Sequence, residues 1–397
     1  MKDGNGIEVV GKNGTARIMS DARDENAISH LYTIMSSGLT EGSTVRVMAD
    51  YHEGKGAVIG FTQRLNPLDP RICPNVVGVD IGCRVTALEL NGCKDIDFQK
   101  LDKFIRDTIP LGAGSYDTGS PLKTRLLGTV WKDNLKLIAD AETLLQQRYG
   151  NGFKTSVVGQ LFSLGSGNHY IEVDRADDGN YWLNVHSGSR NFGLQVATTF
   201  QAMAVKWCPD RCADELKYLS QEAGELYHDY LTCVQACQTF SAVNHVMILC
   251  VLRDYFVAHG WAEGSGEIIT TLHNYIDLDN MIVRKGAISA QLGEQVLIPF
   301  NMRDGIAVCV GKGNEEYNYS APHGCGRLMS RSQAKKALSL DDVKRDMHDS
   351  GVFTTSLDYA LDEAPDAYKD CSSILDLIGD TVDVLKVLKP VYNIKGK

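Results

Sequence analysis

Three segments with the composition of β-strands each lead into a histidine beside small or polar residues. The segments cover residues 157–164, 181–185 and 267–272, and the histidines that follow them are His169, His186 and His273. A single histidine of this kind is usually a hydrogen-bonded structural residue, but its repetition gives equal weight to a metal site. The pattern therefore predicts β-sheets whose strand ends carry a candidate metal centre.

Asp80 and Cys83 lie on either side of Gly82 in a segment of strand-like composition. A backbone kink at this glycine would turn the carboxylate and the thiol toward one point. A carboxylate together with a thiolate suits a borderline divalent ion such as Mn²⁺ or Zn²⁺, and the ion would keep the thiol deprotonated. For this pair taken alone, a buried structural cysteine beside a turn aspartate is the favoured alternative.

An apolar segment at residues 45–49 ends abruptly in Asp50, His52 and Glu53 among glycines. In α/β proteins, active-site residues often follow the end of a strand, where the backbone leaves the sheet. This strand end is therefore a candidate part of an active site. A charged hairpin loop is the alternative.

One further histidine, His323, lies in a turn that also holds Gly324, Gly326 and Arg327. The glycines allow backbone N–H groups to approach a ligand closely, and the arginine could hold an anion. From Ser330 onward the composition favours a helix, whose N-terminus would add to the attraction for phosphate. The turn is typical of phosphoryl transfer, and the alternative is a glycine-rich loop with a surface histidine.

The rest of the chain predicts a scaffold of helices and strands. Helical patterns cover residues 24–35, 122–149, 194–259 and the tail from 362, residues 6–18 form a hairpin, and residues 296–299 and 306–310 form strands. Repeats and linkers are absent from the sequence, so we expect one domain over residues 1–397. The fold class is mixed, α/β with α+β character, and central β-sheets are flanked by helices.

Two other groups of residues bear on binding. Arg284 and Lys285 precede a glycine and suit a phosphate or an RNA backbone. Two cysteine pairs are spaced like half of a metal site: Cys208 with Cys212, and Cys233 with Cys237. Because no matching second pair exists at suitable spacing, packing is the favoured role of these cysteines.

Net charge and cysteine content limit the binding partners and the cellular compartment that we expect. The formal net charge of −10 argues against nonspecific coating of nucleic acid, so a polynucleotide would have to be held by a local surface. The first ten residues do not resemble a signal peptide, and no apolar run approaches the length of a membrane span. The eleven cysteines lack the spacing of a disulfide scaffold. We therefore expect a soluble, cytoplasmic protein with no membrane partner.

Eight short motifs occur together along the chain. They are Val79-Asp80-Ile81-Gly82-Cys83, Gly165-Ser166-Gly167-Asn168-His169, His186-Ser187-Gly188-Ser189-Arg190, His273-Asn274-Tyr275, Arg284-Lys285-Gly286-Ala287, Gly311-Lys312-Gly313-Asn314, His323-Gly324-Cys325-Gly326-Arg327 and Asp362-Glu363-Ala364-Pro365. In this order they resemble the RtcB-type RNA-splicing ligases, from about Val45 to Lys397. Those enzymes depend on GTP and Mn²⁺ and join RNA 3′-phosphate or 2′,3′-cyclic phosphate ends to 5′-hydroxyl ends. The resemblance implies a single-domain RtcB-like fold with a metal-centred cleft and a role in RNA repair or tRNA splicing.

The resemblance also implies roles for individual residues. His323 would be the nucleophile that forms a covalent guanylate through a phosphoramidate bond. The implied ligands of two Mn²⁺ ions are Asp80 and His169 on one ion, His186 and His273 on the other, and Cys83 on both.

Further implied roles concern phosphate and the nucleobase. Asn168 and Arg327 match positions that contact phosphate, and Asp50 matches an acid near the site. Positions that recognise guanine in the family are matched by Glu172, Tyr368 and Lys395. In the implied reaction a cyclic phosphate is opened, GMP passes to the RNA 3′-phosphate to give an RNA-3′-pp-G end, and the 5′-hydroxyl then displaces GMP.

Several positions depart from the pattern of the family. Arg84 stands where glycine is common, His245 where arginine is usual, and Cys325 where alanine is usual. The loop Asn301-Met302-Arg303-Asp304 replaces a small, glycine-containing loop. These differences predict a divergent branch and bear on GTP against ATP preference and on the RNA substrate more than on the metals. Two alternatives remain: a metal-dependent phosphoesterase that opens cyclic phosphates without ligating, and a noncatalytic RNA- or nucleotide-binding relative. The sequence leaves open whether an activating protein partner is needed.

Overall fold

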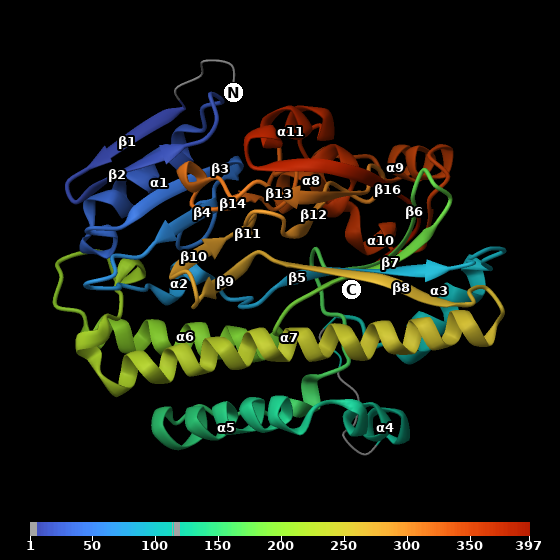
Figure 1. Ribbon diagram of the computed structural model, residues 1–397, viewed down its shortest axis with the longest axis horizontal. Helices are drawn as coiled ribbons and strands as arrows, with labels where there is room; N and C mark the ends of the chain where they lie inside the picture. Colours follow the sequence, from blue (N-terminus) through green and yellow to red (C-terminus); the bar gives the residue numbers. More distant parts are fainter. Residues whose placement is uncertain (1–5, 113, 115–119) are drawn as a thin grey trace.

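The larger of the two main sheets positions most of the candidate residues (Figure 1). The computed structural model describes residues 6–112, 114 and 120–397. Its larger sheet has the order β12-β13-β16-β6-β7-β5-β8, and β15 pairs with β16. The strands are β5 (Arg84–Asn91), β6 (Tyr170–Arg175), β7 (Tyr181–Ser187), β8 (Gly264–Leu272), β12 (Gln295–Pro299), β13 (Ile306–Gly311), β15 (Phe353–Thr354) and β16 (Val382–Lys395).

A second sheet of six strands has the order β1-β2-β3-β4-β10-β9, and β11 pairs with β14 separately. The bounds are β1 (Ile7–Gly11), β2 (Gly14–Ile18), β3 (Thr44–His52), β4 (Ile59–Arg64), β9 (Asn274–Asp277), β10 (Ile282–Lys285), β11 (Ala287–Ser289) and β14 (Ser320–Pro322). The predicted hairpin is confirmed, because β1 and β2 pair antiparallel with Gly11 opposite Gly14. The predicted strands at 296–299 and 306–310 are confirmed as β12 and β13.

Helices cover the larger sheet in layers. Figure 1 shows α6 and α7 along the sheet, with α5 on their outer side. The helices are α1 (Glu25–Ser36), α2 (Pro74–Val77), α3 (Phe98–Thr108), α4 (Pro121–Thr129), α5 (Lys132–Tyr149), α6 (Arg190–Trp207), α7 (Glu225–Ala258), α8 (Arg331–Ala337), α9 (Leu340–Asp349), α10 (Leu357–Ala360) and α11 (Cys371–Leu377). The mixed α/β class with helices flanking sheets is confirmed.

The helix predicted at 24–35 is confirmed as α1, and the helix expected from Ser330 is confirmed as α8. The side chain of Asp24 caps α1 by accepting a hydrogen bond from the N–H of Ala27, 3.1 Å away. Ser330 and Gln333 form a capping box at the start of α8. Both caps satisfy N–H groups that the first turn of a helix leaves without partners.

Helix α7 corrects the expectation that no apolar run reaches membrane-spanning length. By length and composition this helix could cross a membrane. However, 61% of its most apolar 18-residue stretch is buried inside the protein. Its buried face carries core residues such as Phe240 and Leu252. A buried core helix passes the same composition test as a membrane span.

The strand predicted at 157–164 is wrong. This segment forms only a short 3₁₀ turn, Val158–Gln160. Its backbone at Ser163 pairs with a side chain: Oδ1 of Asn244 accepts from the Ser163 N–H at 3.0 Å, and Nδ2 donates to the Ser163 carbonyl at 2.9 Å. The apolar residues are buried, so the pattern indicated burial correctly but not an extended chain.

The tail predicted as helical from residue 362 is also wrong in its second half. Short helical turns and α11 extend only to Asp380, and β16 then inserts between β13 and β6. A bulge lies between Pro390 and Tyr392. The bulge accommodates a proline, which cannot donate to the strand ladder.

Candidate active site

Asp80 and Cys83 lie in the turn between α2 and β5. The predicted backbone kink at Gly82 is present in this turn. Gly82 has φ +78°, and a Cβ added there would lie 2.8 Å from Cα of Gln238 in α7. A side chain at this position would therefore be excluded both by backbone conformation and by contact. Oδ1 of Asp80 accepts a hydrogen bond from the N–H of Ser189 at 3.0 Å, which ties this turn to the start of α6.

The three predicted histidines meet this turn because β5 lies between β7 and β8 in the sheet. His186 belongs to β7, and His273 follows β8 directly. His169 differs from the expectation: it immediately precedes β6 and does not end a strand. The sheet order therefore brings together side chains that are far apart in the sequence.

Cys83 lies at the junction of two groups of ligand atoms. One group is Asp80, Cys83 and His169, the other is Cys83, His186 and His273, and the ligand atoms within each group lie within 4.8 Å of one another. Sγ of Cys83 is 3.2 Å from Nε2 of His186 and 3.6 Å from Nε2 of His169. The two groups share one sulfur, which is the arrangement that a thiolate bridging two cations requires.

Hydrogen bonds outside the cluster orient its members. Nδ1 of His186 donates to the carbonyl of Asn168 at 3.1 Å, which leaves the lone pair of Nε2 directed into the cluster. Nε2 of His169 lies 3.0 Å from Oδ2 of Asp80, and Arg190 donates to the other ring nitrogen of His169 at 3.3 Å. Arg190 is a contact that the sequence analysis did not single out, although it ends one of the quoted motifs.

The electrostatics of the cluster favour neutral imidazoles. Burial, followed by the neighbouring histidines, lowers the pKa of His186 and of His273 well below the usual range. Burial alone would raise the pKa of Asp80, but the hydrogen bond and charge of His169, the hydrogen bond from Cys83 and the charge of Arg190 together outweigh it and lower the pKa to about 2. Burial and the Asp80 carboxylate raise the pKa of Cys83, so a bound cation would be needed to hold its thiolate. Neutral imidazoles and an ionised carboxylate are the forms that bind metals.

His323 follows β14 and faces this cluster. The centroids of its ring and that of His273 are 5.3 Å apart. Nδ1 of His323 lies 2.6 Å from Oδ2 of Asp50 in β3, and the Asp50 side chain is completely buried. Because the carboxylate accepts from Nδ1–H, Nε2 of His323 retains its lone pair.

The glycines of the His323 turn allow this close approach. Gly326 has φ +72°, and a Cβ there would lie 2.4 Å from the carbonyl oxygen of Asp50. A Cβ on Gly324 would lie 2.8 Å from the carbonyl oxygen of Pro299. The backbone of the turn is therefore packed against the strand that carries Asp50.

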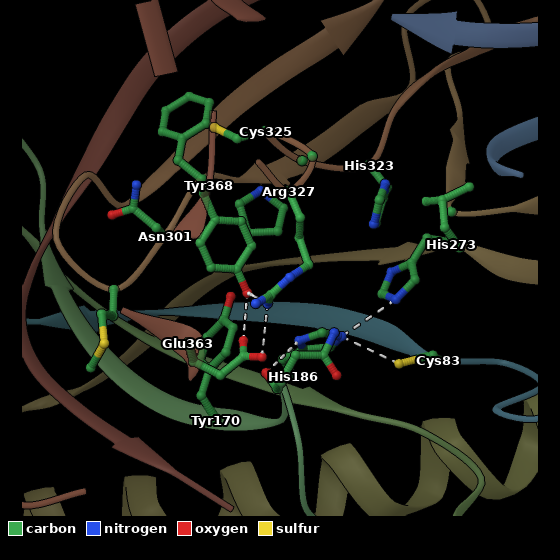
Figure 2. A pocket seen from close by; sticks show the side chains of 18 of the residues that line it. Cys83, Tyr170, His186, His273, Asn301, His323, Cys325, Arg327, Glu363 and Tyr368 are labelled. Atoms are coloured by element: carbon green, nitrogen blue, oxygen red, sulfur yellow. Dashed lines mark hydrogen bonds and ion pairs between the residues drawn. The ribbon is translucent and has the colours of Figure 1, made fainter. Parts of the chain in front are cut away.

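A cavity of about 320 Å³ connects the metal-ligand cluster with the predicted nucleotide residues (Figure 2). The predicted residues that line it are Asp80, Cys83, Asn168, Glu172, His186, His273, His323, Gly324, Gly326, Arg327, Tyr368 and Lys395. Asp50 lies behind His323, and His169 lines a second cavity of about 880 Å³ with Lys154, Arg190 and Arg331. Asp80 and Asn168 line both cavities.

Glu172 and Lys395 lie on adjacent strands at the inner end of the first cavity. Burial raises the pKa of Glu172 to about 7, while the charge of Lys395 opposes the shift. Nδ2 of Asn393 donates to Oε2 of Glu172 at 2.5 Å. Nζ of Lys395 lies 4.8 Å from the ring centroid of Tyr170, and burial lowers the pKa of this lysine. A carboxylate and an ammonium group are thus held side by side.

Arg327 is already engaged by neighbouring groups. Its guanidinium donates to Oε1 of Glu363 at 3.1 Å and to the hydroxyl of Tyr368 at 3.2 Å, and it donates to the carbonyls of Met329 and Asp362. The Tyr368 hydroxyl in turn donates to Glu363. Glu363 is a buried pocket residue that the sequence analysis did not single out, although its motif was quoted.

Arg284 and Lys285, which were predicted to contact phosphate or RNA, are occupied by partners within the protein. Arg284 is fully buried and donates to Oδ2 of Asp277 at 3.0 Å and to the hydroxyl of Tyr275 at 2.8 Å. Lys285 is buried and donates to the carbonyls of Lys55 and Asn75. These cations are structural, which corrects the expectation that they contact phosphate or RNA.

The predicted packing role of the cysteine pairs agrees with their surroundings. Cys208, Cys233 and Cys237 belong to the main hydrophobic core, and Cys212 packs against it. Among the described residues, neither pair belongs to a group of possible metal ligands.

Comparison with known families decides the relationship. The sequence pattern of a family described as tRNA-splicing ligase RtcB matches residues 36–396. The chain belongs to the RtcB family. The RNA-splicing ligase RtcB of Escherichia coli (strain K12) is 31% identical over 381 residues, which cover 89% of this chain and 90% of that protein. The tRNA-splicing ligase RtcB of Nanoarchaeum equitans is 28% identical over 430 residues, with 88% and 87% covered. RNA-splicing ligase RtcB homolog 1 of Entamoeba histolytica is 27% identical over 424 residues, with 88% and 80% covered.

The departures from the RtcB pattern lie at two places. At the cavity, Asn301, Met302 and Cys325 line the wall, and Arg303 forms ion pairs with Asp304 and Asp346. Behind the metal-ligand cluster, Arg84 and His245 are both buried, and the charge of Arg84 contributes to lowering the pKa of His245. The first group shapes the pocket wall, whereas the second group lies under the strands that carry the ligands.

Proposed function

We propose that this chain is an RNA ligase that joins RNA 3′-phosphate or 2′,3′-cyclic phosphate ends to 5′-hydroxyl ends, with GTP and two Mn²⁺ ions as cofactors. Membership of the RtcB family supports this proposal, as do the names of the relatives, which describe RNA- or tRNA-splicing ligases. The observation that carries it is the position of His323, which is paired with Asp50 and borders the donor cluster in one cavity.

The donor cluster fits a pair of borderline divalent cations. Asp80 and His169 would hold one ion, His186 and His273 the other, and Cys83 both. The set contains three imidazole nitrogens, one sulfur and one carboxylate, and the imidazoles of His186 and His273 are held neutral by burial. When bound, the cations would neutralise phosphate charge and keep Cys83 ionised.

His323 would attack the α-phosphorus of GTP through Nε2, because Nδ1 is engaged by Asp50. A nitrogen–phosphorus bond forms, and the bond to pyrophosphate breaks. Asp50 fixes the tautomer of His323 and stabilises the positive charge that develops on the ring. The GMP group then passes from His323 to the RNA 3′-phosphate, which restores the imidazole and gives an RNA-3′-pp-G end. The 5′-hydroxyl attacks the RNA-side phosphorus of this end, a phosphodiester forms, and GMP leaves.

The inner end of the cavity would select the nucleobase. Glu172 offers acceptors and Lys395 offers donors, and guanine presents N–H groups beside a carbonyl oxygen on one edge. Tyr368 contributes an aromatic wall. Asn168 is available for phosphate, whereas most donors of Arg327 are occupied by Glu363, Tyr368 and carbonyls.

The second cavity would hold an RNA end. Lys154, Arg190 and Arg331 line it, and it shares Asp80, Asn168 and Arg331 with the first cavity. A local cationic lining is compatible with the overall acidic charge. We further propose a role in RNA repair or tRNA splicing and a cytoplasmic location, since none of the eleven cysteines forms a disulfide. An activating protein partner is compatible with this proposal.

Incubation of the purified protein with Mn²⁺ and α-³²P-labelled GTP tests the central step. We expect a labelled protein adduct that is absent in His323→Ala and retained in His228→Ala, a histidine exposed on α7. Opening of a 2′,3′-cyclic phosphate without any adduct would support a phosphoesterase instead. An adduct that persists in His323→Ala would overturn the assignment of the nucleophile.

A further inference from the structure

A row of buried polar side chains continues from the cavity into the larger sheet. On β6, Tyr170, Glu172 and Asp174 alternate with buried apolar residues and so share one face. The partners of Glu172 on the adjacent strands are Asn184 on β7 and Asn393 on β16. Of these residues, Glu172 lines the cavity, whereas Asp174 does not.

Asp174 is buried, and among the described residues no cation acts on it. It is completely inaccessible, and Nδ2 of Asn184 donates to its Oδ2 at 2.9 Å. Its other oxygen, Oδ1, is buried and has no donor among the described residues. The neighbouring side chain on the same face of β6, two positions earlier, is that of Glu172, a second carboxyl group whose charge acts on Asp174. Two buried carboxylates on adjacent positions of one strand face repel each other unless one of them carries a proton.

Three observations identify the residue that holds the proton. Glu172 receives a hydrogen bond from Asn393 at 2.5 Å and faces the charge of Lys395, both of which favour its ionised form. Asp174 has no such cation, and burial followed by the charge of Glu172 raises its pKa well above the usual range. A protonated Asp174 would donate its O–H to Glu172, so that each oxygen of the pair has a partner.

We propose that Asp174 is a positioning residue that stays protonated and donates a hydrogen bond to Glu172, which thereby remains an ionised, correctly oriented acceptor for the N–H edge of a purine such as guanine. This inference rests on the proposed function of the cavity as a GTP site. Asp174 touches neither nucleotide nor metal. The titratable and charged groups that act on the pair are Tyr170 on β6 and Lys395 on β16.

Two substitutions of Asp174 should differ in whether the hydrogen bond to Glu172 is kept. Asp174→Asn keeps an oxygen that accepts from Asn184 and an NH₂ group that donates to Glu172. Asp174→Leu removes the donor and keeps the same branched arrangement of side-chain heavy atoms, although its methyl groups are larger than the carboxyl oxygens. Asp177→Leu changes an exposed acid in the turn after the same strand and serves as the control.

Two measurements test the proposal. Infrared spectra recorded well above pH 7, where Glu172 is ionised, should contain the carbonyl stretch of a protonated carboxyl that is lost in Asp174→Asn and kept in Asp177→Leu. Binding of GTP to the Mn²⁺-loaded protein, in the His323→Ala background that prevents turnover, should weaken about tenfold in Asp174→Leu and stay within about threefold in Asp174→Asn.

Either of two results would overturn the proposal: an infrared band that survives Asp174→Asn, or GTP binding as weak in Asp174→Asn as in Asp174→Leu. If the His323→Ala protein with an unaltered Asp174 does not bind GTP, the proposed function fails. The infrared measurement then still decides whether Asp174 holds the proton. Asp174→Asn also covers the case in which Asp174→Leu does not fold.

Discussion

Nδ1 of His323 and Oδ2 of Asp50 lie 2.6 Å apart, although 273 positions separate the two residues in the chain. The carboxylate is fully buried, and its other oxygen has no hydrogen-bond partner among the described residues. A buried carboxylate with one partner holds that partner firmly, because the alternative is an uncompensated charge. Asp50 therefore determines both the orientation and the tautomer of His323.

Asp50→Ala should slow formation of the guanylate adduct by about 10²–10⁴-fold, because His323 would lose its orientation and the charge that stabilises the developing imidazolium. Rapid-quench measurement of adduct formation with labelled GTP gives the rate. Glu53→Gln, an exposed acid beyond the end of the same strand, is the matched control and should react like the unaltered protein. Equal rates for Asp50→Ala and the control would show that the pair has no catalytic role.

Cys83→Ala should abolish tight binding of Mn²⁺, because the two groups of ligands share this sulfur. Cys233→Ala also removes a buried sulfur, but from the core face of α7, and should retain the metal. Equilibrium dialysis followed by elemental analysis compares the two proteins. Similar losses of manganese in both variants would mean that packing, and not ligation, explains the effect.

The identity of the site residues could be predicted from sequence more completely than their arrangement. Asp80 and Cys83 are local, and the kink at Gly82 that turns them together is a property of one glycine. The meeting of His186 and His273 depends on β5 lying between β7 and β8, an order that differs from the order along the chain. Hydrophobic periodicity specifies which face of a strand is buried, and does not specify its neighbours.

Some local patterns had two physical solutions. The apolar run at 157–164 is buried as irregular chain whose backbone finds partners outside a strand ladder. The amide of Asn244 pairs with Ser163, and the N–H of Leu164 donates to the carbonyl of Pro110. Arg284 and Lys285 have the composition of a phosphate site, and only the fold reveals that Asp277 and main-chain carbonyls surround them. A cation in sequence does not carry information about the partner that folding provides.

Arg284→Ala is expected to destabilise the protein by about 2–5 kcal/mol, because it removes a fully buried guanidinium that donates to Asp277, Tyr275 and Ser320 and leaves an empty space in its place. RNA affinity of the folded fraction should be unchanged. Urea unfolding followed by circular dichroism gives the stability, and Arg331→Ala is the contrasting variant because its side chain is 45% exposed and lines both cavities. A loss of RNA binding in stable Arg284→Ala protein would restore the RNA-contact interpretation.

His245 gives the protein a predictable sensitivity to acid. Nδ1 lies 2.9 Å from Oγ1 of Thr86, and Nε2 lies 3.1 Å from the carbonyl of Ser187. Burial, followed by the charge of Arg84, lowers the pKa of His245 to about 3. The pKa of a histidine in the unfolded chain is about 6.5. Between these two values the unfolded chain binds one more proton, so the free energy of unfolding falls as the pH is lowered from 6.5.

His245→Gln should remove this dependence. Between pH 6.5 and 5, the free energy of unfolding of the unaltered protein should fall by about 1.6 kcal/mol more than that of the variant. The slope is about 0.7 kcal/mol per pH unit at pH 6.5, where the unfolded histidine is half protonated, and approaches about 1.4 kcal/mol per pH unit below it. His186 and His273 titrate in both proteins, so their contributions cancel in the difference. Urea unfolding at several pH values measures it, and His228→Gln, an exposed histidine of the same helix, should retain the full pH dependence. Parallel pH profiles for His245→Gln and the unaltered protein would mean that His245 has the same pKa in the folded and unfolded chains. The burial of this α7 side chain against β5 and β7 argues against that result.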